Sequence, residues 1–252
     1  MTDKIKRLIY TALSLLLWLL VWEISAHVLD REYFLPSVER TLEEFFKLLI
    51  TPDFYKITLF TLLRVILGIL IGTSSGIILA VLSHRFEPIY HLVKLPVTVI
   101  RSTPIASFII ILWILLSGDA LCVFVTVLMV FPIIWQNLMD GYSSIDKELC
   151  EMSLVFGFSR QKHFRLITLP ALKRYFIPAI ITSVGLGWKA EIAAEIIAYA
   201  RNSVGQMISD AKYNLLTAEV FAWTLSVVLF SILLEGLTRL LLKKFSVGGK
   251  SK

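Results

Sequence analysis

The sequence predicts an all-α fold, a polytopic membrane bundle of six transmembrane helices. Of its 252 residues, 57% are hydrophobic and 17% are charged, whereas soluble domains average about 45–50% and about 25%. This is too little polar surface to cover a water-soluble globule. Six apolar runs come close to the roughly 20 residues that a membrane span needs. They cover residues 8–29, 57–83, 101–116, 121–138, 175–200 and 220–241.

The first apolar run follows a short basic segment with Lys4, Lys6 and Arg7. The apolar core of a cleaved signal peptide has about 7–15 residues. This run is longer, so we expect a retained span with its N-terminus in the cytoplasm. After it, residues 30–56 mix charges with apolar residues at helical spacing, which predicts an amphipathic helix on the outer face. The apolar positions are Val38, Leu42, Phe45, Phe46 and Leu49. Residues 1–56 therefore form an N-terminal span followed by an outer segment.

The second run carries a stripe of small residues at every fourth position. The stripe consists of Gly68, Gly72, Gly76 and Ala80. Small residues at this spacing line one helix face and let another backbone approach closely. Glycine is also common in membrane helices that make no such contact. Four small residues in register favour a packing face, although the sequence does not identify the partner helix.

The third and fourth runs are expected to form an antiparallel hairpin. A polar connection at residues 84–94 precedes them, the third run begins near Arg101 and Pro104, and Gly118-Asp119 joins the two runs. So short a join leaves room only for a tight turn between adjacent helices.

Lysine and arginine gather on one side of the predicted bundle. They are concentrated before the first span, between the second and third spans, in the loop after the fourth span and in the tail at residues 243–252. Because positive loops face the cytoplasm, we expect both termini and the loop at residues 141–170 to be cytoplasmic. Residues 57–242 then form the main transmembrane domain.

The loop at residues 141–170 predicts two short helices that meet at a glycine. Asp146 or Ser144 can cap a helix that begins near Lys147, and Ser159 can cap the second helix. Gly157 can supply the left-handed residue that ends the first helix. An apolar stripe on the first helix, formed by Leu149, Met152, Val155 and Phe156, indicates a docking surface for a partner.

This loop resembles the EAA signature of ABC-importer permeases, which reads E-A-A, three residues, G, nine residues, I-x-L-P. The matching residues are Glu151, Met152, Ser153, Gly157, Ile167, Leu169 and Pro170. The spacing agrees throughout, while Met152 and Ser153 replace the two alanines. In that family the first helix is the coupling helix, which fits a cleft on the ATPase subunit.

The flanking chain is similar to the nitrate, taurine and alkanesulfonate branch of these permeases. The similarity covers nearly the whole chain. It includes Trp22-Glu23, the stretches 34–38 and 63–65, Arg101 followed by Pro104, Phe131-Pro132, and the stretch 202–205. The stretch 187–191, Gly-Trp-Lys-Ala-Glu, departs from the more usual small-Gly-Arg-Ala pattern, so the resemblance does not extend to the substrate.

The resemblance implies a type I ABC-importer fold in a bacterial or archaeal cytoplasmic (inner) membrane. It implies a homodimer of this chain, two ABC ATPase subunits inside, a solute-binding protein outside, and inward transport of a small, by analogy anionic, solute. No P-loop is present, because Lys244 stands where the first glycine before Gly249-Lys250-Ser251 is required. We therefore expect a non-enzymatic chain without a cofactor, with ATP–Mg bound by the partner ATPase.

Four charged residues in or beside the apolar runs are candidates for the substrate path: Arg101, Lys189, Glu191 and Glu195. Intramembrane charges are costly and face a cavity or a partner. Glu191 and Glu195 are four apart and share a helix face, whereas Lys189 points elsewhere, near mid-bilayer. These charges either line the translocation path or form structural pairs, and Arg101 could instead extend toward the membrane surface.

Other function classes fit less well. A secondary transporter or channel without an ATPase partner, the main alternative, would show internal inverted repeats or broken helices, and no such repeat is visible. The scattered histidines and the two cysteines, Cys122 and Cys150, have no metal-binding spacing, which also disfavours an intramembrane enzyme. The basic residues are not interleaved with aromatics as nucleic-acid binding would require.

Overall fold

A computed structural model describes residues 3–29 and 33–246, and the secondary structure of this part of the chain is entirely helical. The elements are α1 (Asp3–Leu29), α2 (Val38–Ile50), α3 (Pro52–Arg85), α4 (Glu87–Ser102), α5 (Ile105–Leu115), α6 (Gly118–Ser143), α7 (Lys147–Val155), α8 (Arg160–His163), the π-helical turn η1 (Phe164–Thr168), α9 (Leu169–Ala198), α10 (Val204–Tyr213) and α11 (Thr217–Ser246). The predicted basic tail lies mostly outside the described residues.

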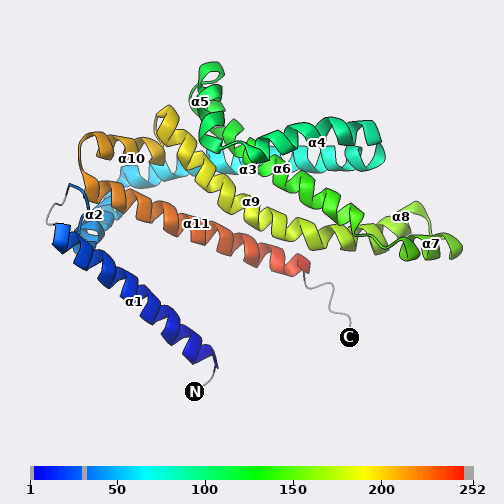
Figure 1. Cartoon of the computed structure of the whole chain (residues 1–252), viewed down its shortest axis with the longest axis horizontal. Coiled ribbons are helices and arrows are strands. Elements are labelled where there is room, and N and C mark those ends of the chain that lie inside the picture. The colour runs from blue at the N-terminus through cyan, green and yellow to red at the C-terminus, as the bar shows by residue number, and fades with distance from the viewer. Residues whose placement is uncertain (1–2, 30–32, 247–252) are drawn as a thin grey trace.

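The centre of the bundle consists of α3, α6 and α9, which run along the long axis of the molecule (Figure 1). The α3–α6 and α6–α9 contacts are the most extensive, and α11 packs against α9 with α2 against α11. Within the described residues, five helical segments are long and apolar enough to cross a membrane, and the number rises to six if the bent pair α4–α5 forms one span. The all-α membrane bundle is therefore confirmed.

The small-residue stripe of α3 packs against α6. A Cβ atom added at Gly72 would lie only 2.8 Å from the Cβ atom of Val130, so a larger residue requires the helices to separate. Successive turns repeat this contact. The pairs are Gly68 with Thr126, Gly72 with Val130, and Gly76 with Ile134. The predicted close contact is thus confirmed, and its partner is α6.

The third predicted span, residues 101–116, is wrong as a single helix. The chain forms α4 and α5, which are bent by 110° at residues 103–104. Pro104 cannot donate a backbone hydrogen bond and disfavours helical geometry at the residue before it, and Thr103 is extended, with ψ at 134°. The polar connection expected at residues 84–94 is also helical, because α3 continues to Arg85 and α4 begins at Glu87.

The first helix stands away from the bundle along most of its length (Figure 1). Its C-terminal end is held by two hydrogen bonds to the chain around α2. Trp22 Nε1 donates to the Pro36 carbonyl at 3.0 Å, and the Val38 amide donates to Glu23 Oε2 at 2.8 Å. The amphipathic helix predicted within residues 30–56 is confirmed as α2, whose Ser37 side chain caps its first turn.

Candidate functional site

The helical hairpin of α7 and α8 is built by the caps that the sequence predicts. Asp146 accepts a hydrogen bond from the Glu148 amide and begins α7, and Ser159 accepts one from the Lys162 amide and begins α8. Between them Gly157 adopts a left-handed conformation with φ at +62°. Residues without a Cβ atom reach this region at little cost, so the tight reversal depends on this glycine.

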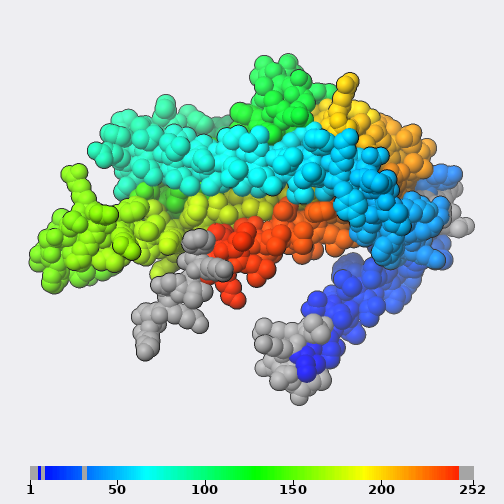
Figure 2. Space-filling view, turned by 180° about the vertical axis from the view of Figure 1, so that it is seen from behind, coloured from blue at the N-terminus to red at the C-terminus, as the bar shows by residue number. Residues whose placement is uncertain are grey.

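The tip of this hairpin exposes three consecutive apolar side chains. Leu154, Val155 and Phe156 are 77%, 85% and 71% exposed. The hairpin projects from one end of the molecule, beyond the rest of the bundle (Figure 2). Contiguous exposed apolar side chains on a projecting loop are typical of a protein-docking surface.

The remaining motif residues lie on different sides of the hairpin. Glu151 and Met152 are exposed with the tip, Ser153 is buried, and Ile167 and Leu169 are half-buried. Pro170 occupies the first turn of α9, directly after the π-helical turn η1. Because α8, η1 and α9 follow one another without a gap, one helical segment runs from the loop to the opposite end of the bundle.

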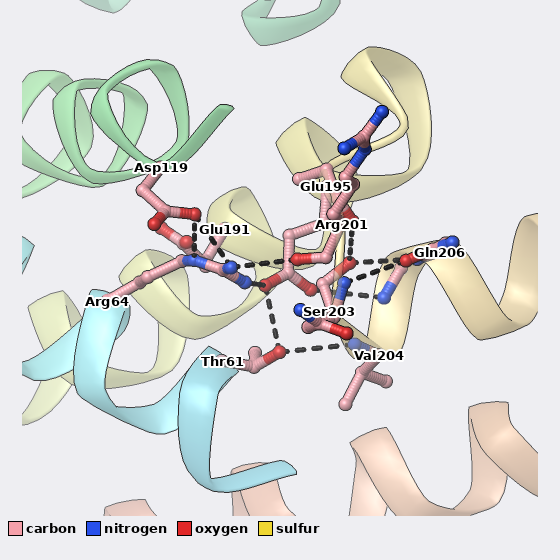
Figure 3. Close-up of polar contacts among 12 residues, drawn as sticks. Thr61, Arg64, Asp119, Glu191, Glu195, Arg201, Ser203, Val204 and Gln206 are labelled. Atoms are coloured by element: carbon pink, nitrogen blue, oxygen red, sulfur yellow. Dashed lines mark hydrogen bonds and ion pairs between the residues drawn. The ribbon is translucent and has the colours of Figure 1, made fainter. Parts of the chain in front are cut away.

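That opposite end holds a buried polar network centred on Arg64 of α3 (Figure 3). Its guanidinium donates to Asp119 Oδ1 at 2.9 Å, to Glu195 Oε1 at 3.0 Å and to the Arg201 carbonyl at 2.9 Å. Asp119 is largely exposed, whereas Glu195 is completely buried. Arg64 therefore joins α3 to the start of α6, the end of α9 and the loop after α9.

The Glu195 carboxylate is satisfied on both oxygens (Figure 3). Thr61 donates to Oε1 at 2.8 Å, and the Gly205 amide of α10 donates to Oε2 at 3.0 Å. The Thr61 hydroxyl also accepts the Val204 amide at 3.1 Å. Removing one partner from such a buried pair typically costs about 3–5 kcal/mol, so the network fixes α10 onto the bundle.

Glu191 is also completely buried, one turn before Glu195. Its Oε2 accepts a hydrogen bond from Thr126 of α6 at 2.6 Å. Its Oε1 has no hydrogen-bond partner among the described residues. Both glutamates thus point into the protein between helices of this chain, and the partner of Glu195 is Arg64.

Lys189 and Arg101 have different surroundings from the two glutamates. Both side chains are exposed, and neither forms an ion pair within the described part of the chain. Lys189 lies on the exposed face of α9 together with Thr182 and Leu186. Arg101 lies in the last turn of α4, next to the bend.

Sequence reasoning missed the central residue of the network. Arg64 is a cation inside the second apolar run, and an intramembrane arginine is by itself a sign of a buried partner. Glu235 and Arg239 are four residues apart in the last apolar run, a spacing that predicts a local ion pair. Within the described residues the two side chains form no ion pair.

Comparison with known proteins places this geometry in a family. Residues 68–247 match the family described as "Binding-protein-dependent transport system inner membrane component". The chain is 25% identical over 240 residues to a nitrate import permease protein of Synechocystis, covering 91% of this chain and 86% of the relative. It is 22% identical over 231 residues to a taurine transport system permease protein of Escherichia coli, covering 89% and 82%.

A solved structure supports the same fold. The crystal structure of an amino acid ABC transporter with histidines matches with a TM-score of 0.63 at 17% identity, over 78% of this chain and 94% of that one. The family model covers well over half of the chain. The chain therefore belongs to the binding-protein-dependent transport family, as a multi-pass, non-catalytic inner-membrane permease subunit of an ABC importer.

Proposed function

We propose that two copies of this chain form the membrane path of an importer for a small anionic solute. Two ATPase subunits, which bind ATP–Mg, dock on the α7–α8 hairpin, and a solute-binding protein docks at the opposite end. Closure of the ATPases moves the hairpin, and alternating access carries the solute inward. The single observation that carries this proposal is the exposed apolar tip, which lies just before the continuous helical segment formed by α8, η1 and α9.

The tip supports an ATPase partner because its apolar side chains have no other cover. Leu154, Val155 and Phe156 would remain in water if nothing docked on them, and burying each such side chain contributes about 1.5–3 kcal/mol. The residues that match the EAA pattern lie in α7, in the turn after it, in η1 and in the first turn of α9. These coupling residues are Glu151, Met152, Ser153, Gly157, Ile167, Leu169 and Pro170.

Lys189 supports an anionic solute. It lies nine residues before the end of α9 at Ala198, about 14 Å along the helix axis and therefore deep in the bilayer. A cation at the bilayer centre costs about 2.5–3.5 kcal/mol on insertion scales, so its exposed ammonium group needs a water-filled path or an anion. Nitrate, named for one relative, is an anion. We assign Lys189, and with it Arg101 at the bend, to the path, and Glu191 and Glu195 to the packing beside it.

The distribution of basic residues supports an orientation in which the hairpin end of the bundle faces the cytoplasm. Basic residues accumulate at the hairpin end, which by the positive-inside rule faces the cytoplasm. We infer that both termini and the hairpin are cytoplasmic. The Arg64 network and α10 then face outward, toward the solute-binding protein.

The substitution Phe156→Asp tests the docking surface. A carboxylate at the tip should prevent burial against the ATPase, so we expect affinity-purified permease to retain less than about a tenth as much ATPase subunit as wild type. The matched control is Phe34→Asp, which places the same charge on a similarly exposed phenylalanine in the connection between α1 and α2. Equal ATPase retention in wild type and Phe156→Asp would contradict the proposal.

A further inference from the structure

A hydrogen bond between two side chains closes the α7–α8 hairpin from its inner side. Ser153 Oγ of α7 lies 2.8 Å from His163 Nδ1 of α8. The same hydroxyl donates to the Cys150 carbonyl at 2.7 Å. Ser153 is 1% exposed, so water does not compete for these bonds.

The hydrogen-bonding capacity of serine determines which group donates. A hydroxyl carries one hydrogen, and that of Ser153 is directed to the Cys150 carbonyl. The contact with His163 therefore requires a hydrogen on Nδ1, and the ring donates to the serine oxygen. The neutral ring with its proton on Nδ1 and the doubly protonated ring both satisfy this requirement.

The bond matters because little else fixes the angle between these helices. α7 has nine residues and α8 has four, and helices this short are marginal without tertiary contacts. The Phe158 amide donates to the Ser153 carbonyl at 2.9 Å, and the Lys162 ammonium lies 4.1 Å from the centre of the Phe158 ring. No other side-chain hydrogen bond joins α7 to α8 within the described residues.

We propose that Ser153 and His163 form a positioning pair that sets the angle at which the apolar tip is presented to the ATPase. The proposal rests on the proposed coupling function of this hairpin. It explains why serine stands where the EAA pattern has alanine. The pair lies on the buried side of α7, whereas the adjacent Leu154 and Val155 are exposed, so the bond acts on the tip without contacting the partner.

The two amide substitutions of His163 separate the hydrogen bond from the shape of the ring. In His163→Asn the side-chain amide is the same number of bonds from Cα as Nδ1, so it can donate to Ser153. In His163→Gln the amide is one bond further away and matches Nε2 instead. Ser153→Ala removes the acceptor and introduces the alanine of the EAA pattern. All three substitutions lie in the α7–α8 hairpin, so the membrane bundle should fold in every variant.

Two measurements are made on each full-length variant. The first is backbone amide exchange of residues 147–163 in the detergent-solubilised permease. The second is the ATP hydrolysis rate per ATPase subunit that co-purifies with it. We expect Ser153→Ala and His163→Gln to exchange about 2- to 10-fold faster, the range that the loss of one hydrogen bond produces, and to hydrolyse ATP several-fold more slowly. His163→Asn should stay within about 2-fold of wild type in both.

The outcomes distinguish this inference from the coupling function itself. If His163→Asn behaves like His163→Gln, or if all three variants match wild type while Phe156→Asp loses the ATPase, the positioning pair is wrong and the docking surface stands. If faster exchange leaves ATP hydrolysis unchanged, the pair stabilises the hairpin without positioning the tip, which also overturns the inference. If Phe156→Asp retains the ATPase as well, the proposed coupling function fails.

Discussion

Lys189 and Glu191 lie two residues apart on α9, and yet their side chains have opposite surroundings. A helix turns about 100° per residue, so this spacing directs one side chain out of the protomer and the other into it. Glu191 and Glu195 face α3, α6 and α10, where threonine, arginine and amide donors surround them. Lys189 has no ion-pair partner among the described residues, which is why we propose that its charge meets the solute.

For Lys189→Met we expect uptake by the reconstituted importer to fall at least about tenfold, because the cation that offsets the solute's charge inside the bilayer is lost. Lys189→Arg keeps the charge and should retain part of the uptake. Uptake is measured with labelled nitrate, bicarbonate and taurine, together with the yield of assembled complex. Lys173→Met makes the same change at the exposed start of α9 and serves as the control. Normal uptake at normal yield in Lys189→Met would remove the residue from the path.

Among the helices, α3 and α6 form a contact that leaves little room for larger side chains. Three glycines on α3 bring the two backbones close enough that a methyl group at any of them would lie within 2.8 Å of a side-chain atom of α6. In a membrane, where water does not drive helices together, such close packing supplies much of the association. The α4–α5 pair is the opposite case, because only Ile109 of α5 is completely buried and Ile110, Ile114 and Leu115 are exposed.

Gly72→Leu should therefore destabilise the bundle more than Leu70→Ala does. A leucine at position 72 meets Val130 and must displace α6, and overpacking of this kind typically costs about 1–3 kcal/mol. Leu70 is exposed on the other side of α3, so its truncation removes few protein contacts. Thermal stability in detergent, followed as the fraction that remains monodisperse after heating, compares the two variants. Equal shifts would mean that the glycines are incidental.

At the scale of the whole molecule, the two ends of the bundle differ in structure. The hairpin of α7 and α8 projects at one end, and α10 with the Arg64 network lies at the other (Figure 1). A single helical segment, α8 through α9, connects them. If ATPases displace the hairpin, as we propose, the displacement would reach Lys189 and the Arg64 network through one continuous element.

Cysteine labelling in intact cells tests the orientation of these ends. We expect Ser117→Cys and Arg201→Cys to react with a membrane-impermeant maleimide from outside, and Gln161→Cys to react only after the cells are opened. All three side chains are exposed, whereas Ser203 is buried and caps α10, so it is a poor probe. The probes are introduced into a Cys150→Ala background, because Cys150 is partly exposed. Cys122 is buried and can stay. Labelling of Gln161→Cys in intact cells would reverse the topology.

The sequence by itself determined the features that depend on local spacing. Hydrophobic runs gave the all-helical membrane class, small residues four apart gave a packing face, and Asp146, Gly157 and Ser159 gave the caps and the reversal of the hairpin. Each of these follows from the geometry of one helix or one turn, which nearby residues control. The 110° bend after Arg101 was missed, although Pro104 signalled a break.

Only the tertiary structure decided which distant groups meet. Arg64 and Glu195 are separated by 131 positions, Ser153 and His163 by ten, and Gly72 packs on Val130 of α6, with two helices between them along the chain. No local pattern specifies these pairings, because they depend on how helices rotate and approach when apolar faces and buried charges are satisfied together. For the same reason, the tertiary structure alone separated the buried glutamates of α9 from its exposed lysine.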